Sequence, residues 1–416
     1  MTSLKGKPAA SSNVDGQRRQ ILIGAVGATA VSALGFPGLV LSQPAPFKLG
    51  LIHSVSGPTA DNGQHCRAGA LMAIEDVNAR GGIKSLGGTK IEAVLGDSQG
   101  RVEIGVSEVE RMHQNGINAY QGCYNSAVVI AATQAAARYG TPFVVDVGVS
   151  DLITSRGLTN VFRFSPGFGT CVRDGVATLG ALNNSAGNLA KSAIVIHESS
   201  EYGTSTANLI RNQLPGIGIE VKEVISHDTP TRSFDNIALR IRSAAPDVVI
   251  HIGYINEYML LARTIHRFKL NVTPYSILGG GFGAKLVREA PEAAANMLDF
   301  NHWYNPKDPR VAALRKRTEA QKMDFIFEIY CAYNSVMLLA DALERSGKRD
   351  NEAVISSLAS STWNDHFMPY GPTKFVNGQN QGGAGVGLQV LDGEIRVIAP
   401  SQFAEAKPVF PRPKQG

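Results

Sequence analysis

From residue 47 onward, short apolar runs alternate with segments of helical periodicity. Residues 47–53 form an apolar run, and Gly57 and Pro58 mark the loop after it. Ala70, Ala73, Ile74 and Val77 then follow the i, i+3, i+4, i+7 spacing of a helix, which ends at a Gly-Gly pair. The same pattern predicts further strands at 91–95, 117–121 and 143–147 and helices at 103–114 and 126–138. Strands and helices alternating over short connections predict parallel βαβ units.

A second series of the same kind begins near residue 168. Its strands are expected at 193–196, 219–224, 248–252 and 275–278, and its helices at 204–214, 234–243, 257–268 and 284–290. These strands are continuously apolar, as expected when both faces of a sheet are covered. The fold class is therefore α/β, with two doubly wound, Rossmann-like lobes. Two long helices at 309–322 and 325–344 follow, with strands near 387–391 and 395–397, so we expect the chain to return to the first lobe.

The N-terminal residues have the composition of an export signal. Arg18 and Arg19 precede an uncharged apolar stretch, 21–41, and a small polar segment up to residue 46. The paired arginines resemble a twin-arginine signal, although the usual Ser before the pair and Lys after it are missing. Residues 1–46 are thus predicted to direct the protein to the periplasm. Ordinary secretory export and a membrane anchor remain alternatives.

Charge and cysteine content narrow the function classes. The chain has 40 Lys and Arg against 35 Asp and Glu, and four of the basic residues lie before residue 47. A nearly neutral body gives no electrostatic footprint for nucleic acid, so no nucleic-acid partner is expected. The four cysteines form no C-x-x-C motif, and we expect buried thiols or at most one bridge.

Motifs for enzyme chemistry are missing from the sequence. It contains neither a G-x-S-x-G elbow nor H-E-x-x-H, and its nine histidines form no spaced metal cluster. The glycine run 279–283 is followed by Lys285 without the Ser or Thr of a phosphate loop. No catalytic residue, metal or cofactor is therefore expected.

The predicted topology places a ligand site in a cleft between the lobes. In open α/β sheets, ligands bind beyond the carboxyl ends of the strands, where helix N-termini present free N–H groups. The polar side chains expected there are His53, Asn62, Tyr124, Asn125, Ser126, Ser150, Glu198, Tyr202, Tyr254 and Asn256.

Several segments carry a family resemblance. They are the Ser-Gly-Pro loop at 56–58, the Asn-Ala-Arg-Gly-Gly-Ile run at 78–83, Gly122 with Ser126, Glu201-Tyr202-Gly203, Gly253-Tyr254 and residues 343–347. Together they resemble the branched-chain amino-acid (Leu/Ile/Val) periplasmic binding proteins, the solute receptors of ABC importers. The resemblance implies a type I fold with three crossovers, a permease of the inner membrane as partner, and a monomer. It implies a first lobe of 47–166 plus 299–370, a second lobe of 167–298 plus 371–400, and a C-terminal tail of 401–416.

The resemblance also implies roles for individual residues. Ser126, with neighbouring backbone N–H groups, would hold a ligand carboxylate; a simple helix N-cap is the alternative. Gly148, Val149 and Ser150 match the loop that contacts the ligand carboxylate and ammonium. Tyr202 and Tyr254 match lining tyrosines, unless they only pack in the interior.

Two departures from the family pattern affect the ligand. Gly281 stands where amino-acid binders place a carboxylate, and Asn62 stands where an aromatic wall is usual; Phe282 follows the glycine. A buried ammonium without a carboxylate costs several kcal/mol. We therefore expect a small aliphatic or aromatic carboxylate rather than free leucine, unless Glu198 or Glu257 supplies the charge. A ligand-sensing regulatory protein of the same fold is the alternative function.

Overall fold

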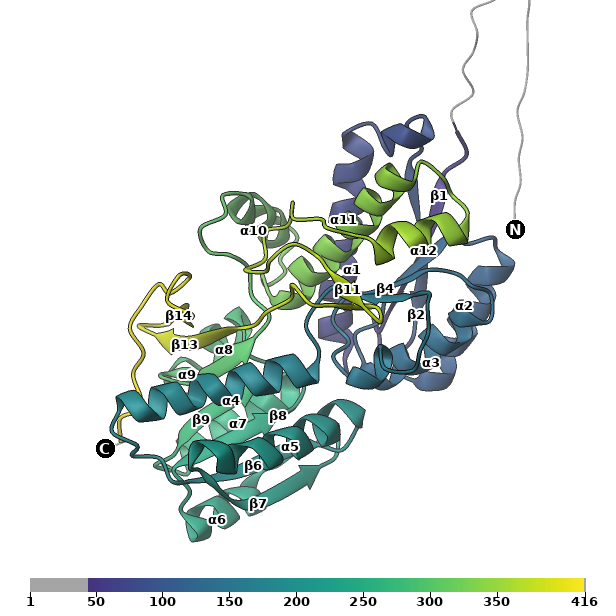
Figure 1. The fold of residues 1–416 in the computed structure, drawn as a ribbon. Helices are drawn as coiled ribbons and strands as arrows, with labels where there is room; N and C mark the ends of the chain where they lie inside the picture. The colour runs from purple at the N-terminus through teal and green to yellow at the C-terminus, as the bar shows by residue number, and fades with distance from the viewer. Residues whose placement is uncertain (1–43, 415–416) are drawn as a thin grey trace, which may run out of the picture. The chain divides into compact units, whose positions relative to one another are not determined.

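Two seven-stranded sheets carry the fold of the computed structural model, which describes residues 44–414 (Figure 1). The predicted export signal lies almost entirely outside these residues. Within the described part of the chain, no helix combines the length and the apolar character needed to cross a bilayer. The described residues belong to one compact unit.

The first sheet has the strand order β11-β12-β5-β4-β3-β1-β2. Strands β1 to β5 run parallel to one another, and β12 runs parallel to β5. Only β11 is antiparallel to its neighbour, β12. The strands are β1 (Phe47–His53), β2 (Ile91–Asp97), β3 (Ala119–Gly122), β4 (Phe143–Val145), β5 (Val161–Arg163), β11 (Phe375–Val376) and β12 (Gln379–Asn380).

The second sheet has the order β14-β13-β10-β9-β8-β6-β7. Strands β6 to β10 are parallel, and β13 and β14 add an antiparallel edge. The strands are β6 (Ser192–Glu198), β7 (Glu220–His227), β8 (Val248–Ile252), β9 (Thr273–Ile277), β10 (Leu298–Asn301), β13 (Val386–Leu391) and β14 (Glu394–Ala399).

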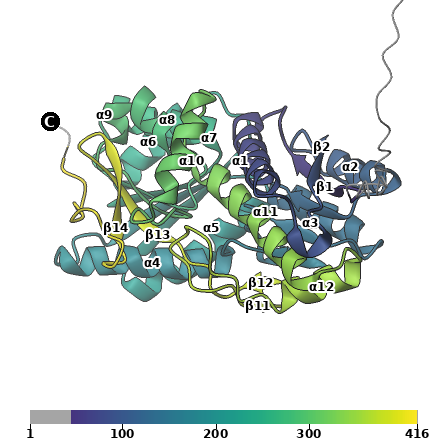
Figure 2. The ribbon, with the colours of Figure 1, turned by 90° about the horizontal axis from the view of Figure 1, so that it is seen from above.

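Helices cover the faces of both sheets, and one long pair packs closely. Figure 2 shows α1 (Ala60–Ala79) beside α11 (Phe327–Ser346), which returns from the second sheet. A Cβ on Gly69 would lie 2.1 Å from the carbonyl oxygen of Ile329, so only glycine allows this approach. The other helices are α2 (Val102–Gln114), α3 (Ser126–Ala137), α4 (Phe168–Ser185), α5 (Glu201–Gln213), α6 (Asp235–Ala244), α7 (Ile255–Arg267), α8 (Ala284–Glu289), α9 (Pro291–Ala294), α10 (Arg310–Ala320) and α12 (Asn351–Ala359).

The chain passes between the sheets three times, as predicted. It crosses after β5, returns between β10 and β11, and crosses again between β12 and β13. Sheet membership changes near the predicted lobe boundaries but not at them. Strand β10 already belongs to the second sheet at residues 298–301, and β11 and β12 keep residues 375–380 in the first.

The sequence pattern missed four short strands and three helices. Strands β5, β10, β11 and β12 have only two to four residues, too few to show a period. Helix α4 contains Gly169, Gly175 and Gly180, which lower its helix propensity. A Cβ on Gly175 would lie 2.9 Å from Ile277, so the glycine allows close packing on β9. The other missed helices are α9 and α12.

All four cysteines are buried free thiols. Cys66 lies in α1, Cys123 directly follows β3, and Cys331 lies in α11. Burial raises the pKa of each of these thiols. The expectation of buried thiols is confirmed, and their role is packing.

Candidate functional site

A cavity lies beyond the carboxyl ends of strands from both sheets, with about 340 Å³ of empty space that is partly open to solvent. Aromatic and polar side chains share its wall with a few small residues. The lining residues are Tyr124, Ser126, Val147, Val149, Tyr202, Tyr254, Leu278, Gly280, Asn301, His302 and Phe327. Segments that follow strands of the first sheet, including the start of α3, supply the first four. Segments at the ends of strands of the second sheet, including the start of α5, supply the next six, and α11 supplies Phe327.

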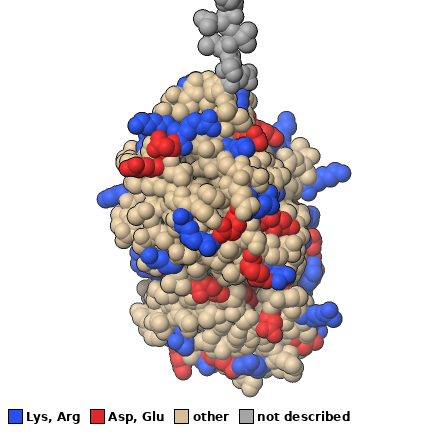
Figure 3. All heavy atoms as spheres, turned by 90° about the vertical axis from the view of Figure 1, so that its right-hand side faces the viewer, with Lys and Arg blue, Asp and Glu red and all other residues tan. Residues whose placement is uncertain are grey.

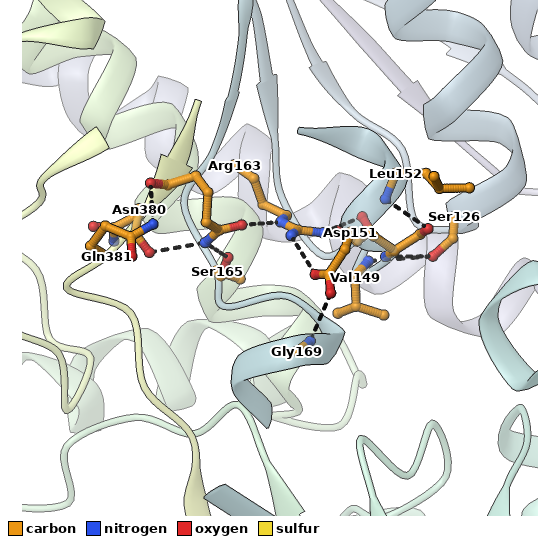
Figure 4. A network of polar contacts seen from close by, with 12 residues as sticks. Ser126, Val149, Asp151, Leu152, Arg163, Ser165, Gly169, Asn380 and Gln381 are labelled. Carbon is orange, nitrogen blue, oxygen red and sulfur yellow. Dashed lines mark hydrogen bonds and ion pairs between the residues drawn. The ribbon is translucent and has the colours of Figure 1, made fainter. Parts of the chain in front are cut away.

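Ser126 is the first residue of α3, and its hydroxyl does not cap that helix. Asn125 occupies the N-cap position, without a side-chain hydrogen bond to the helix. The Ser126 Oγ instead accepts hydrogen bonds of 3.3 Å from the backbone N–H groups of Val149 and Ser150 (Figure 4). Its own hydroxyl hydrogen has no acceptor among the described residues and remains available at the cavity.

Arg163 fixes the 148–150 loop from behind. This fully buried side chain donates to the carbonyl oxygens of Gly148 (3.3 Å) and Ser150 (2.6 Å). It also pairs with Asp151 at 3.3 Å, and Asp151 accepts from the N–H of Gly169 at 2.9 Å (Figure 4). Burial lowers the pKa of Arg163 to about 10, so the guanidinium stays charged at neutral pH. The loop amides therefore lie near a fixed positive charge.

Three tyrosines form the aromatic part of the wall. The ring centroids of Tyr202 and Tyr254 are 5.4 Å apart, and those of Tyr124 and Tyr254 are 5.9 Å apart. The Tyr202 hydroxyl donates to the carbonyl oxygen of Leu278 at 2.5 Å. The Tyr254 hydroxyl accepts from the Asn125 amide at 3.4 Å. Burial raises the pKa of all three phenols, which are neutral.

Five of the predicted site residues line the cavity, namely Tyr124, Ser126, Val149, Tyr202 and Tyr254. The other predicted site residues do not line the cavity. Gly148 and Ser150 direct their carbonyls to Arg163, and the Ser150 hydroxyl donates to Glu201 at 2.7 Å. Gly280 rather than Gly281 reaches the cavity, while Gly281 packs on Tyr258 and Phe282 is fully buried.

His53 lies in the interior below the first sheet's edge and does not line the cavity. Arg67 Nε donates to His53 Nδ1 at 3.2 Å, so His53 Nε2 carries the hydrogen that it donates to Asp146 at 3.0 Å. The ligand atoms of His53, Cys66 and Asp146 all lie within 4.8 Å of one another, a spacing that a metal ion could bridge. Both histidine nitrogens are already engaged, however, and the Arg67 guanidinium would repel a cation. This group is a hydrogen-bonded core cluster.

The sequence analysis missed a polar wall formed by Asn301, His302 and the start of α11. His302 is 1% exposed, and neither ring nitrogen has a hydrogen-bond partner. Burial lowers its pKa to about 3, so the imidazole is neutral. Next to Phe327, Glu328 is fully buried, and burial raises its pKa to about 8. The only hint in the sequence is that these residues follow a short apolar strand or begin a helix.

Asn62 connects this wall to the second sheet. Its amide donates to Glu328 Oε1 at 2.5 Å and to the Gly280 carbonyl oxygen at 3.3 Å. The two acids considered as ammonium partners lie elsewhere. Glu198 accepts from Ser200 and from the N–H of Gly203, and Glu257 accepts from the N–H of Thr231. Neither acid lines the cavity.

Polar contacts join the loops of the two sheets around the cavity. Lys285 pairs with Asp61 at 2.8 Å, and the Ser150–Glu201 and Asn125–Tyr254 hydrogen bonds span the same gap. These contacts hold the two lobes together beside the cavity.

Charge on the surface is mixed. On the face in Figure 3, basic and acidic side chains are interspersed. The three-residue basic run Arg315–Arg317 does not form a basic patch, because Arg317 pairs with Asp76 and Glu75. This distribution gives no clustered basic surface for nucleic acid.

Two doubly wound sheets with a cavity beyond their strand ends are the architecture of a two-lobed solute-binding protein. A family model described as periplasmic binding protein matches residues 46–393, and the chain belongs to that family. It is a binding protein of the ABC-transporter type, similar to branched-chain amino-acid binders, and not an enzyme. Family members are periplasmic, and their role implies a permease partner.

Relatives and solved structures support this placement. The chain is 26% identical to Leu/Ile/Val-binding protein homolog 8 of Brucella suis, over 94% of this chain and 98% of that one. It is 30% identical to the Leu/Ile/Val-binding protein BraC3 of Rhizobium johnstonii, over 80% and 87%.

Among solved structures, a leucine-binding protein of Thermotoga maritima has a TM-score of 0.73 at 21% identity, covering 85% of this chain and 97% of that one. Two binding proteins from R. palustris have the same fold, each at 19% identity. The one in complex with benzoate has a TM-score of 0.74 (88% and 99% covered), and the one with 4-hydroxybenzoate has 0.72 (85% and 95% covered).

Proposed function

We propose that the protein is the exported receptor of an ABC importer and binds a small carboxylate in the cavity between its lobes. One observation carries this proposal: the Ser126 hydroxyl lies on the wall with a free hydrogen, beside two backbone amides that Arg163 holds in place. A carboxylate accepts hydrogen bonds only, and it is stabilised by a helix N-terminus and a nearby cation. The Ser126 hydroxyl is the donor that would hold it, and the N–H groups of Val149 and Ser150, which donate to the Ser126 oxygen, would strengthen that donor.

The rest of the wall favours a ligand without an amine. Among the described residues that line the cavity, none is Asp or Glu. Glu328, the nearest candidate, is neutral at pH 7, and the carboxylates of Glu198 and Glu257 already accept hydrogen bonds elsewhere. An ammonium would therefore lose hydration without a paired charge. The tyrosines and Phe327 instead suit a flat or branched apolar body.

A branched-chain amino acid is the second candidate ligand. The relatives named Leu/Ile/Val-binding proteins favour it, and so does the position of Glu328 beside Phe327. Ionisation of Glu328 by an incoming ammonium would supply the missing charge. Solved proteins of this fold hold leucine or benzoate, so the fold itself accommodates both classes.

Ligand delivery would proceed by hinge closure. The contacts Lys285–Asp61, Ser150–Glu201 and Asn125–Tyr254 link the lobes and would form when they close on the ligand. We further propose that the monomer is exported through the twin-arginine-like segment at Arg18 and Arg19, and that its closed form docks on the permease.

A thermal-shift panel of amino acids, aliphatic acids, aromatic acids and amides tests the ligand class. A ligand at 100 times its Kd adds about 2.7 kcal/mol to the free energy of unfolding, which moves Tm by a few degrees. We expect carboxylates that lack an amine to stabilise the protein. Stabilisation by leucine-like amino acids alone would select the second candidate, and no response from any carboxylate would contradict the proposal.

The variant Ser126→Ala tests the carboxylate site. Loss of one hydrogen bond to a charged group should weaken carboxylate binding by about tenfold or more. Ser357→Ala is the matched control, because Ser357 is a buried serine that bonds to Ala342 within the α11–α12 region. Equal affinities for Ser126→Ala and the control would remove Ser126 from the site.

A further inference from the structure

His302 is a cavity-wall side chain whose polar atoms no protein group satisfies. Its backbone is held firmly, because its N–H donates to Asn301 Oδ1 at 2.8 Å and its carbonyl oxygen accepts from Tyr330 at 3.5 Å. Its ring contacts Phe327 edge to face, with centroids 6.0 Å apart. Both Nδ1 and Nε2 nevertheless lack hydrogen-bond partners within the described chain.

Such an arrangement is costly unless a ligand completes it. A buried polar group without a partner costs about 1–3 kcal/mol, and most buried groups in native proteins are paired. His302 is one of the residues that line the cavity, so a molecule bound there lies next to it. A neutral imidazole offers one N–H donor and one bare nitrogen acceptor.

The chemistry of a neutral imidazole restricts its partner. A second carboxylate would find only one donor on the ring, and an ammonium would find one acceptor and no compensating charge. A hydroxyl group suits whichever nitrogen faces the ligand, because it can donate to the bare nitrogen or accept from the N–H, and it carries no charge. The carboxylate of the same ligand would be held by Ser126, so the hydroxyl belongs to a different part of the molecule.

The remaining lining residues define what lies between the two polar groups. Three tyrosines and Phe327 line the cavity. Flat aromatic bodies pack on such rings in offset or edge-to-face arrangements. A hydroxyl on a ring is also held at a fixed distance from the carboxylate.

We propose that His302 is a specificity-determining residue that selects a hydroxyl-bearing aromatic carboxylate by hydrogen bonding to its ring hydroxyl. This inference rests on the proposed function, since it assumes that Ser126 holds the carboxylate. Asn301, which precedes His302, positions it through the bond to its backbone N–H.

Isothermal titration of the purified full chain with benzoate, 3-hydroxybenzoate and 4-hydroxybenzoate tests the inference. We expect at least one hydroxybenzoate to bind about tenfold more tightly than benzoate. His302→Leu should abolish this preference while benzoate affinity stays within about threefold. His302→Gln, which keeps a donor and an acceptor, should restore part of it.

His366→Leu is the matched control. His366 is also a buried histidine with an unpartnered Nδ1, but it does not line the cavity. Its replacement should leave the preference for the hydroxyl unchanged.

Each other outcome overturns a distinct claim. Equal affinity of the wild-type protein for benzoate and both hydroxybenzoates, or an unchanged preference in His302→Leu, refutes the role of His302 and leaves the carboxylate site intact. A uniform loss for all three ligands in His302→Leu also refutes it, since the residue would then be structural. If the wild-type protein binds none of the three acids and responds only to amino acids, the non-amino-acid ligand itself is wrong.

Discussion

Two buried histidines in this protein have similar burial and opposite surroundings. His53 belongs to the core cluster with Asp146 and Arg67, and both of its ring nitrogens are engaged. His302 belongs to the cavity wall, and neither of its nitrogens has a partner in the described chain. Burial lowers the pKa of both, so each is a neutral imidazole.

The contrast separates a structural polar group from a ligand-binding one. In the core cluster, Asp146 also accepts from Gln121 at 3.2 Å, and Arg67 donates to the carbonyl oxygen of Gly96 at 2.5 Å. A hydrogen-bonded network in which both nitrogens of the histidine are engaged specifies how the elements around the first sheet fit together. In the wall around His302, the missing partner is the one that a ligand would provide.

Breaking the core cluster should have the largest effect on stability. Asp146→Ala removes the acceptor of both His53 and Gln121 and leaves their buried N–H groups unpaired. We expect the free energy of unfolding to fall by about 3 kcal/mol. Equilibrium denaturation in urea measures this change, with Asp228→Ala, at an exposed aspartate, as control. A loss below 1 kcal/mol would show that the cluster is not structural.

Much of the two-sheet architecture could be predicted from the sequence. Apolar strands and helical spacing predicted the two-sheet architecture and the return of the chain to the first lobe, because these patterns are local. The three crossovers were implied by the family resemblance. Strands β5 and β10 have three and four residues and show no period, so their positions required the tertiary fold.

For the site, residues that follow strands predicted from the sequence could be named, and residues that follow an unpredicted strand could not. Tyr124, Ser126 and Tyr254 follow β3 or β8 and line the cavity. His53 also ends a strand, but Arg67 on α1 and Asp146 draw it into the core. His302 follows the undetected β10, and Glu328 comes from α11, which returns to the first sheet. Whether a buried side chain finds a partner depends on such distant segments.

The pH dependence of stability should distinguish Glu328 from the paired acids. Burial raises its pKa from 4.5 to about 8, so the folded protein holds a proton that the unfolded chain releases above pH 4.5. The contribution of the protonated Glu328 to the free energy of unfolding is fully present below pH 4.5 and is lost as the pH rises to 8. Relative to Glu328→Gln, the wild-type protein should lose about 2 kcal/mol of unfolding free energy between pH 5 and 7.

Urea denaturation of both proteins at several pH values measures this difference. Asp299, whose pKa burial raises to about 7, contributes a slope of the same sign to both proteins and therefore cancels. Glu319→Gln, at an exposed position of α10, should have the wild-type pH dependence. Parallel curves for Glu328→Gln and the wild-type protein would mean that Glu328 is ionised at neutral pH, which would favour an ammonium-bearing ligand.

The smallest change in the free energy of unfolding is expected from His302→Leu in the absence of ligand, and the sign of this change is informative. Because the ring nitrogens have no partners, His302→Leu removes an unpaired polar group without breaking a side-chain hydrogen bond. We expect the free energy of unfolding to rise by up to about 1 kcal/mol, opposite to the loss in Asp146→Ala. Denaturation of ligand-free protein measures it. A loss of 2 kcal/mol or more would mean that the imidazole has a structural partner, and the contrast with His53 would then no longer identify a ligand-binding histidine.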